Sequence, residues 1–305
     1  GATVNITGNS IIANTTRGTG TSDGIVTGVP AASVNLTNNL VREMTLTAAS
    51  GAFRGIENTG AATTAINIDD NKLGDATGGF VSYAQATSGA LTGILNSGGA
   101  AAGPALSIQR NDIRGISNPA GGSQAHDYIN ASAGTFTSET IKDNTFTNLS
   151  VNNTGQTTLI RVGASLVGTA AGLQTITNNS IVGTFTRLGA SGNMFGLAVT
   201  IAVAPGNQAI NNSNNNFSNV VLTGTGQGTC ISNLDSPLKT IQNNTCSNWG
   251  GTSGTLTGII VNNGKAPMIT SNTITNWTGG GSITGILVNG DTGNNPIGTV
   301  SSNTV

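Results

Sequence analysis

The sequence predicts an all-β chain wound as a parallel solenoid of about ten coils. Three observations predict it: a recurring six-residue motif, the spacing of its apolar positions, and a second marker between its copies. The motif reads apolar, x, x, Asn, x, apolar, as in residues 141–146, and its spacing of 28 to 40 residues is typical of a repeat architecture. Its ten asparagines are Asn9, Asn39, Asn71, Asn111, Asn144, Asn179, Asn215, Asn244, Asn272 and Asn303.

The apolar positions of the motif predict a bend at the asparagine. The residue two places after each Asn is apolar or a cysteine, and the residue three places before it is apolar in nine copies. Two inward residues five apart cannot lie on one face of a straight strand, because strand side chains alternate with period two. A bend at the Asn, between two short strands, lets both apolar residues face inward. Asn tolerates the left-handed backbone conformation that such a bend requires. In the seventh copy Asn212 takes the earlier apolar place, which predicts an irregular corner whose register can slip.

A second marker lies about halfway between successive asparagines. It is a glycine followed by Ile or Leu, as in Gly55-Ile56, and Ile129, Ile160 and Ile231 take the equivalent places without the glycine. This marker predicts a third short strand in each coil. Equivalent residues of successive coils would then stack at about 4.8 Å, and the asparagine side chains would form a hydrogen-bonded ladder along the axis.

The recurring Ile-x-x-Asn-x-Ile with its following Gly-Ile resembles the right-handed parallel β-helix repeat of the pectate-lyase-like superfamily, over essentially the whole chain. The Gly, Asn and Thr-rich texture is also similar to that of large bacterial surface β-helix proteins. The resemblance implies a right-handed winding and an extracellular or cell-surface location. It does not select a function, since that fold hosts lyases, hydrolases, phage tailspikes and non-catalytic surface adhesins.

Composition limits the possible partners. Charged residues are 8% of the chain, against about 25% in an average soluble protein. The net charge is −1 with scattered basic residues, which argues against nucleic-acid binding. No apolar run reaches the roughly twenty residues of a membrane helix, so direct membrane insertion is not expected. The expected partners are neighbouring coils of the same long chain, end-to-end copies of it, and surface glycans.

Length alone does not divide the chain into domains. At 305 residues two domains would be a usual expectation, but each coil of a solenoid contacts only its neighbours, so its size is not limited. A single domain over residues 1–305 is predicted. Neither end shows a capping element, which predicts a segment of a longer protein.

The weak catalytic candidates are Asp70, Arg110 and Asp143, which share one column just before the ladder asparagine. The two carboxylates would lie about 9.6 Å apart across two coils, near the separation of an inverting glycosidase. Arg110 between them favours a surface ion-pair column instead. Asp69, adjacent to Asp70, is expected to face the opposite way, and no residue-by-residue match to a calcium-dependent lyase site exists. No cofactor is predicted, although calcium in an Asn/Asp-rich turn stays open.

Aromatic and sulfur side chains give further candidates. His126 is the single histidine, which excludes multi-histidine metal sites, and it is predicted to be a solvated loop residue with general base as the alternative. Trp249 and Trp277 stand five residues after their asparagines and are predicted to stack in the core, with a sugar-binding platform as the alternative. Cys246 is predicted to face inward and Cys230 outward, and whether they pair is left open.

The sequence therefore predicts a non-catalytic structural or adhesive segment of a secreted or cell-surface β-solenoid fibre. The first alternative is a polysaccharide lyase or glycoside hydrolase with its groove in the coils from Asn71 to Asn144. A phage tailspike is the second alternative. Uniform repeats and the lack of clustered chemistry favour the structural role.

Overall fold

The structure is a computed structural model that describes residues 1–100, 103–163, 165–166, 173–200, 209–234, 238–262, 267–289 and 298–305. Within these ranges the chain forms parallel strands and no helix. Successive coils add strands to four stacked sheets, which we name A, B, C and D in the order in which each coil reaches them. The predicted all-β parallel solenoid is confirmed, and the ten strands of sheet A agree with the predicted ten levels.

The strands of each sheet follow one another up the molecule in sequence order. Sheet A contains β1 (Thr3–Thr7), β5 (Ala31–Thr37), β9 (Ala62–Asn67), β13 (Ala105–Gln109), β18 (Ser138–Lys142), β23 (Leu173–Thr177), β27 (Ala209–Ser213), β30 (Leu238–Gln242), β34 (Met268–Thr270) and β37 (Thr299–Ser301). Sheet B contains β2 (Ser10–Ile12), β6 (Leu40–Arg42), β10 (Lys72–Leu73), β14 (Asp112–Arg114), β19 (Thr145–Thr147) and β24 (Ser180–Val182), and continues past two isolated bridges of Asn216 with β31 (Thr245–Ser247) and β35 (Thr273–Thr275).

Sheets C and D complete each coil. Sheet C contains β3 (Thr15–Thr16), β7 (Met44–Leu46), β11 (Val81–Tyr83), β15 (Ile116–Asn118), β20 (Ser150–Val151), β25 (Phe185–Arg187), β28 (Val220–Leu222) and β32 (Trp249–Gly250). Sheet D contains β4 (Ser22–Thr27), β8 (Phe53–Asn58), β12 (Leu91–Asn96), β16 (His126–Ala131), β21 (Thr157–Val162), β26 (Met194–Thr200), β29 (Gly228–Leu234), β33 (Leu256–Asn262) and β36 (Ile283–Asn289). A short extra pair, β17 (Thr135–Phe136) and β22 (Ser165–Leu166), follows sheet D in two coils.

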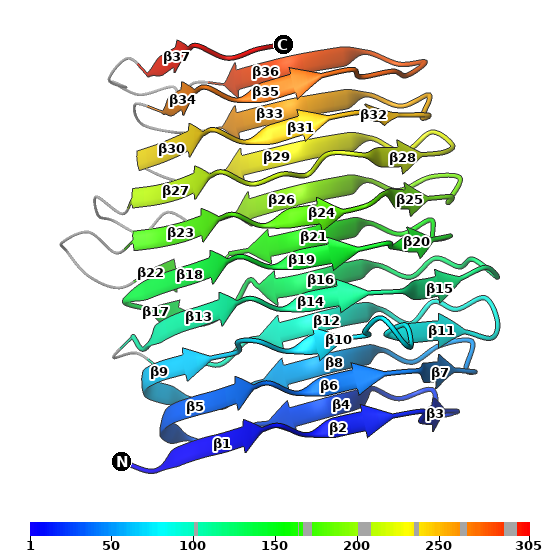
Figure 1. The fold of residues 1–305 in the computed structure, drawn as a ribbon, viewed down its shortest axis with the longest axis vertical. Coiled ribbons are helices and arrows are strands. Elements are labelled where there is room, and N and C mark those ends of the chain that lie inside the picture. The colour runs from blue at the N-terminus through cyan, green and yellow to red at the C-terminus, as the bar shows by residue number, and fades with distance from the viewer. Residues whose placement is uncertain are drawn as a thin grey trace.

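The winding is right-handed. In Figure 1 the strands of sheets A, B and C run from left to right in front, and those of sheet D return from right to left behind them. The chain climbs from the N-terminus at the bottom to the C-terminus at the top. A crossover of this hand is the usual one between parallel strands, because it follows the right-handed twist of the strands.

The predicted asparagine ladder is present at the corner between sheets A and B. Each ladder Nδ2 donates to the Oδ1 of the next ladder asparagine at 2.9 to 3.0 Å, as from Asn111 to Asn144. The same Oδ1 also accepts the backbone N–H of the previous asparagine. The second amide proton goes to a carbonyl in the coil below, as from Asn144 to Ile108. The ladder therefore satisfies the backbone groups that the bend removes from the sheets.

The bend itself differs from the prediction. The residue with positive φ is the one before each ladder asparagine, such as Asp143 (φ 55°) before Asn144, and not the asparagine itself. A second positive-φ residue stands four places after the ladder asparagine, such as Asn148 (φ 49°). It separates sheet B from sheet C, so each coil carries four strand positions where the sequence predicted three. The second bend escaped prediction because Ala, Glu, Gly and Asn all occupy it.

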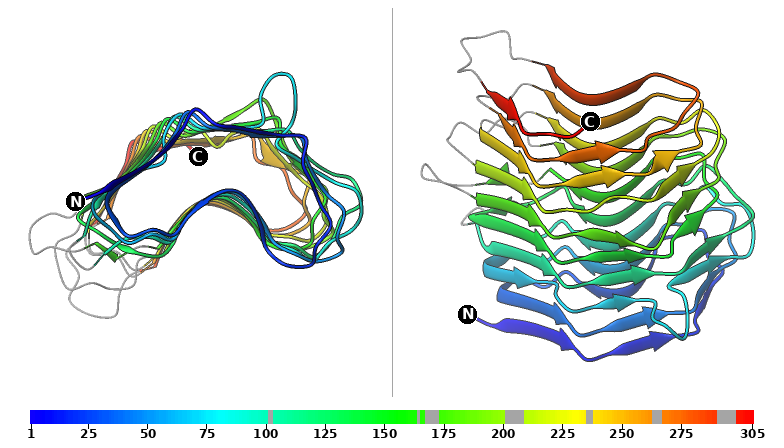
Figure 2. Two further views of the ribbon diagram at one scale, coloured as in Figure 1. Left: turned by 90° about the horizontal axis from the view of Figure 1, so that it is seen from below. Right: turned by 45° about the horizontal axis from the view of Figure 1, so that its top comes forward.

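Coil length varies outside the ladder corner. In the longest interval, five extra residues form a loop at 75–79 between β10 and β11, and this loop projects from the corner in Figure 2. Its first residue, Asp75, accepts the backbone N–H groups of Thr77 and Gly78. The residues that follow this loop, Val81–Tyr83, lie in strand β11. The seventh corner does not slip, because Asn212 pairs in register with Ile176 and Ile241.

The cross-section is bean-shaped, since sheet D curves inward at its middle (Figure 2). The predicted Gly-Ile marker lies at this waist. A Cβ on Gly55 would lie 2.8 Å from the Phe80 ring and 3.1 Å from Leu73, so only glycine lets the sheet approach so closely there. The register pairs Ile129 with both Ile94 and Ile160, as predicted for coils without the glycine. The waist divides the core into two lobes, one beside sheet A and one beside sheet C.

Candidate functional site

The predicted carboxylate column is an ion-pair column on the outer corner. Arg110 makes a two-pronged contact with Asp70, with Nε to Oδ1 at 2.7 Å and Nη2 to Oδ2 at 2.8 Å. This hydrogen bond and the guanidinium charge lower the pKa of Asp70. Asp143, one coil further, lies 3.5 Å from Lys142 Nζ and adds to the field that raises the pKa of Arg110. The three residues share the positive-φ position of successive corners.

The sequence predicted that Asp69 would face away from Asp70, and this prediction is wrong. Asp69 Oδ2 lies 3.9 Å from Arg110 Nη2, because the positive φ of Asp70 resets the alternation of side chains. Burial raises the pKa of Asp69, against hydrogen bonds from Ser107 Oγ and the Gln109 N–H that lower it. Both oxygens of this carboxylate are therefore held by protein groups rather than open to a substrate.

His126 is a buried strand residue and not a solvated loop residue. It opens β16, is fully buried, and stands in register with Leu91 of the coil below. Its ring stacks on Tyr83 at 6.0 Å, and its Nδ1 lies 3.3 Å from the Tyr128 hydroxyl. Burial, together with the charge of Arg187, lowers the pKa of His126 to about 3. A neutral imidazole closed off from solvent cannot serve as a general base for an external substrate.

The two tryptophans stack across neighbouring coils, as predicted, with ring centroids 5.4 Å apart and an interplanar angle of 14°. Trp249 is fully buried and Trp277 partly buried. Each indole N–H donates to a backbone carbonyl, of Phe217 and Cys246 respectively. The pair is thus tied into the core, and the ring of Trp249 offers no face to a sugar.

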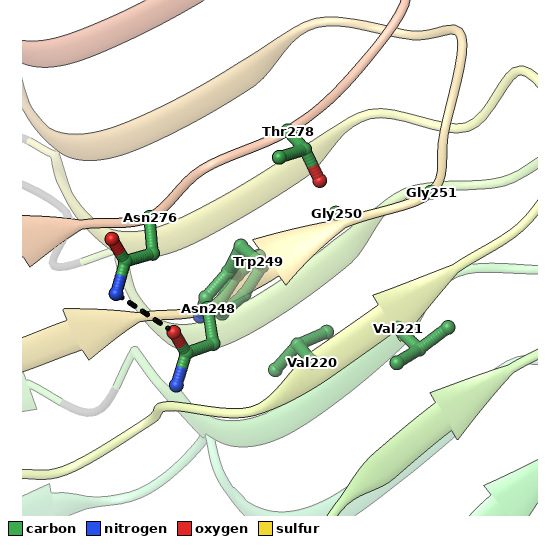
Figure 3. A pocket seen from close by; sticks show the side chains of 8 residues that line it. All are labelled: Val220, Val221, Asn248, Trp249, Gly250, Gly251, Asn276 and Thr278. Carbon is green, nitrogen blue, oxygen red and sulfur yellow. Dashed lines mark hydrogen bonds between the residues drawn. The ribbon is translucent and has the colours of Figure 1, made fainter.

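An outer depression of about 300 Å³ lies beside this pair, on sheet C and the corner before it. Figure 3 shows the Asn248–Asn276 hydrogen bond (3.2 Å) along one side of it and the side-chain-free Gly250 and Gly251 on the other. Its lining residues are Val220, Val221, Asn248, Trp249, Gly250, Gly251, Asn276 and Thr278. None of them ionises, so this depression offers contact surface and no acid–base chemistry.

Cys230 and Cys246 form a disulfide, with Cα atoms 6.1 Å apart. Cys230 faces inward, contrary to prediction, because sheet D bends at the waist and the simple alternation of side chains fails there. It takes the place that Gly196 and Gly258 take in the neighbouring coils. The bond therefore joins sheet D of one coil to sheet B of the next across the narrowest part of the core.

Sequence reasoning missed several buried ionisable side chains, among them Glu139, Lys239 and Arg187. Glu139 is fully buried, accepts a hydrogen bond from Gln174 Nε2, and has its pKa raised by burial to about 8. Lys239, in the same inward column of sheet A, donates to the carbonyls of Asn233 and Asn262. Arg187 is 1% exposed on sheet C. Their position in the motif could have revealed Glu139 and Lys239. Each stands two places before the first apolar residue of the motif, and residues two apart on a strand face the same side.

Within the described ranges, no three His, Cys, Asp or Glu side chains gather as a metal-binding group would require. In the same part of the chain, no helix has the length and apolar character of a membrane span. No family model matches the chain, and comparisons with characterised proteins and with solved structures find no significant similarity.

Proposed function

We propose that this chain is a non-catalytic structural and adhesive segment of a secreted or cell-surface β-solenoid fibre. The observation that carries the proposal is the ladder of hydrogen-bonded asparagines, which links ten successive levels without a missing rung. The backbone hydrogen bonds between the parallel strands of successive coils also run along the axis. Every inner coil is therefore held by two neighbours over all its sheets, which suits a rod that transmits force.

The buried disulfide supports a location outside the cytosol. Cys230 and Cys246 are both fully buried, and such bonds form and persist in oxidising compartments. The low charge and polar outer faces fit the same setting. Surface glycans are the partner class that we propose for adhesion, since a chain with only 8% charged residues offers mainly neutral groups to a ligand.

The charged corner supports a non-catalytic role. An inverting glycosidase needs one carboxyl group whose raised pKa keeps it protonated as the acid. Asp70 has the opposite shift, because Arg110 binds its ionised form. Arg110 also lies in the coil between Asp70 and Asp143, where a substrate and its attacking water would have to fit.

Single-molecule force spectroscopy tests the structural role. With the chain held at both ends, we expect coils to detach one after another, with contour-length steps that match repeats of 28 to 40 residues, or about 90 to 145 Å at 3.3 to 3.6 Å per residue. Extension in one step at low force, without coil-sized increments, would contradict the proposal.

A turnover assay on acidic and neutral polysaccharides tests the enzymatic alternative. The matched pair is the unchanged chain and the double variant Asp70→Asn plus Asp143→Asn. We expect no turnover from either protein. Turnover by the unchanged chain that disappears in the variant would replace the structural role with a catalytic one.

A further inference from the structure

The outer face of sheet C carries a continuous column of hydroxyl side chains. The register of the sheet stacks one outward residue of each strand over the next, from β7 to β25 (Figure 1). In each of these five coils that residue is a serine or a threonine, and none of the five is buried. We call them the hydroxyl column: Thr45, Ser82, Ser117, Ser150 and Thr186.

The hydroxyl groups of this column are open to a ligand. Among the described residues, the bond that Ser82 Oγ donates to the Met44 carbonyl, at 3.5 Å, is the single side-chain hydrogen bond that any of the five makes. A hydrogen bond of that length is weak. Equivalent atoms of successive coils lie about 4.8 Å apart. The column therefore presents one hydroxyl group, both donor and acceptor, at every coil step along the rod.

The column runs between two depressions of the same outer face. The lower one has a volume of about 250 Å³, and its lining includes the first three members of the column and the corner glycines Gly79 and Gly115. The upper one is the depression of about 300 Å³ in Figure 3, where Val221 and then Gly250 continue the column above Thr186. From β11 in the lower depression to β32 in the upper one there are five coil steps, or about 24 Å at about 4.8 Å each.

Glycine keeps both depressions open. A Cβ on Gly79 would lie 2.4 Å from the Gly115 carbonyl oxygen, and a Cβ on Gly250 would lie 2.2 Å from Thr278 Oγ1. No side chain therefore stands at these places. Val221, which is 44% exposed, lies beside Gly250 in the column and gives the upper depression an apolar contact.

The same face is nearly free of charge. Within the described lining of the two depressions, Glu43 is the one ionisable residue, and no member of the hydroxyl column ionises at ordinary pH. An anionic ligand would meet this carboxylate and no cation of the lining. A ligand rich in neutral hydroxyl groups suits the face better, since each of its groups can donate to one hydroxyl and accept from another.

We propose that the outer face of sheet C binds a linear neutral polysaccharide that lies along the rod axis, over the hydroxyl column, with a sugar ring in each depression. A sugar unit of an extended polysaccharide is similar in length to one coil step, so successive units meet successive hydroxyl groups. An extended peptide repeats its same-side groups only about every 6.6 Å and would lose register with the column. The proposal rests on the adhesive role proposed above, and it names the glycan class and the face that binds it.

In the upper depression the lining matches the two sides of a sugar ring. The apolar side of the ring would lie on Val221, and its hydroxyl groups would reach the amides of Asn248 and Asn276 on one side and the hydroxyl group of Thr278 on the other. The depression is large enough for a small ligand group.

Affinity electrophoresis of the whole chain tests the glycan class. The gels contain hydroxyethylcellulose, glucomannan or lichenan as linear neutral probes, or polygalacturonate as the acidic one. We expect at least one neutral polymer to retard the chain and polygalacturonate to leave its mobility unchanged. Retardation by polygalacturonate alone would overturn the neutral class, whereas retardation by no polymer would overturn the adhesive role as well. The structural role is tested separately by the force measurement.

Calorimetry with oligosaccharides of the retarding polymer tests the axial placement. We expect the hexasaccharide to bind at least tenfold more tightly than the disaccharide, because six units are needed to reach across five coil steps from one depression to the other. Equal affinities would show a site for a single sugar and would overturn the placement along the column.

A matched pair of double variants tests the face. Ser117→Val plus Ser150→Val removes two neighbouring hydroxyl groups from the middle of the column, and valine suits an outward strand position, so the fold is kept. This variant should bind the hexasaccharide at least tenfold more weakly. The control, Thr140→Val plus Thr175→Val, removes two neighbouring hydroxyl groups from the outer face of sheet A and should bind as the unchanged chain does. Unchanged affinity in the first variant, or an equal loss in the control, would overturn the assignment to sheet C.

Discussion

His126 takes an interior place that Phe53 and Leu91 fill in the two coils below it. An imidazole there must stay neutral, since its surroundings supply the positive guanidinium of Arg187 and no carboxylate contact. The unfolded chain binds a proton at His126 below a pKa of about 6.5, whereas the folded chain resists this down to about 3.

Acid should therefore destabilise the fold through this residue. The contribution of His126 is complete above pH 6.5 and is lost as the pH falls toward 3, by on the order of 5 kcal/mol. Urea unfolding at several pH values measures it. His126→Leu should flatten the profile in this window, and an unchanged slope in that variant would assign the acid effect to other groups.

Glu139 should act in the opposite direction. Burial raises its pKa from 4.5 to about 8, so the folded chain keeps a proton that the unfolded chain loses. Its contribution is complete below pH 4.5 and is lost as the pH rises through 8. Glu139→Gln should remove this loss and unfold at higher urea than the unchanged chain at pH 8.5. Equal midpoints at that pH would show that the carboxyl group is not buried in the neutral form.

At this scale the sequence predicts the periodic residues and not the aperiodic ones. The ladder asparagines repeat ten times, so their inward position follows from parity. Each positive-φ residue and each waist resets the alternation of side chains, and counting from the nearest apolar residue then fails. This is why Cys230 and Asp69 face directions other than those predicted.

The asparagine ladder stabilises the corner between sheets A and B in every coil. Asn144→Ala would leave the Asn111 N–H and the Ile108 carbonyl without their partners, and it would break the ladder in the middle. Each such buried group costs about 1 to 3 kcal/mol, so we expect a loss of about 4 kcal/mol in unfolding free energy. The control is Asn178→Gly, at an exposed positive-φ position (φ 58°), where glycine is tolerated and the loss should be below 1 kcal/mol. Equal losses would show that the bend, and not the ladder, holds the corner.

At the waist, the disulfide between Cys230 and Cys246 joins one pair of neighbouring coils. The bond closes a separation of 16 residues, and its removal by Cys230→Ser plus Cys246→Ser should cost about 3 kcal/mol. Guanidinium unfolding with and without reductant measures this loss. Reductant should lower the midpoint of the unchanged chain and leave that of the double variant where it is. A midpoint insensitive to both changes would mean that the packing of neighbouring coils alone holds the waist.

The elements were predictable where each requires one residue type. Asparagine is needed at the ladder because its short side chain carries two N–H donors and a carbonyl acceptor, and the ladder uses all three. Glycine marks six of the waist positions because a Cβ would meet the opposite sheet. The second bend accepts Ala13, Glu43, Gly115 or Asn148 alike. A position with such loose chemistry carries no sequence signal, and the fourth strand was missed with it.

The whole molecule is a linear stack, and its stability should be a sum over coils and their interfaces. Deletion of residues 39–70 removes one full repeat and joins Asn38 to Asn71, which keeps the corner sequence. We expect a folded monomer with the same β-sheet circular dichroism per residue. Deletion of residues 39–54 removes half a repeat, reverses the strand directions that follow, and should give an aggregated product. Similar behaviour of the two deletions would argue against a modular rod.

At the largest scale the sequence predicted the stacking and the winding, and it could not predict the outline of the section. That outline follows from the inward curve of sheet D, which depends on contacts between coils. Elementary mechanics gives this shape a consequence. A beam with a narrowed, elongated section has unequal flexural rigidity about its two transverse directions. This rod should therefore yield to bending about the long dimension of its section and resist it about the short one, as a flat ruler does.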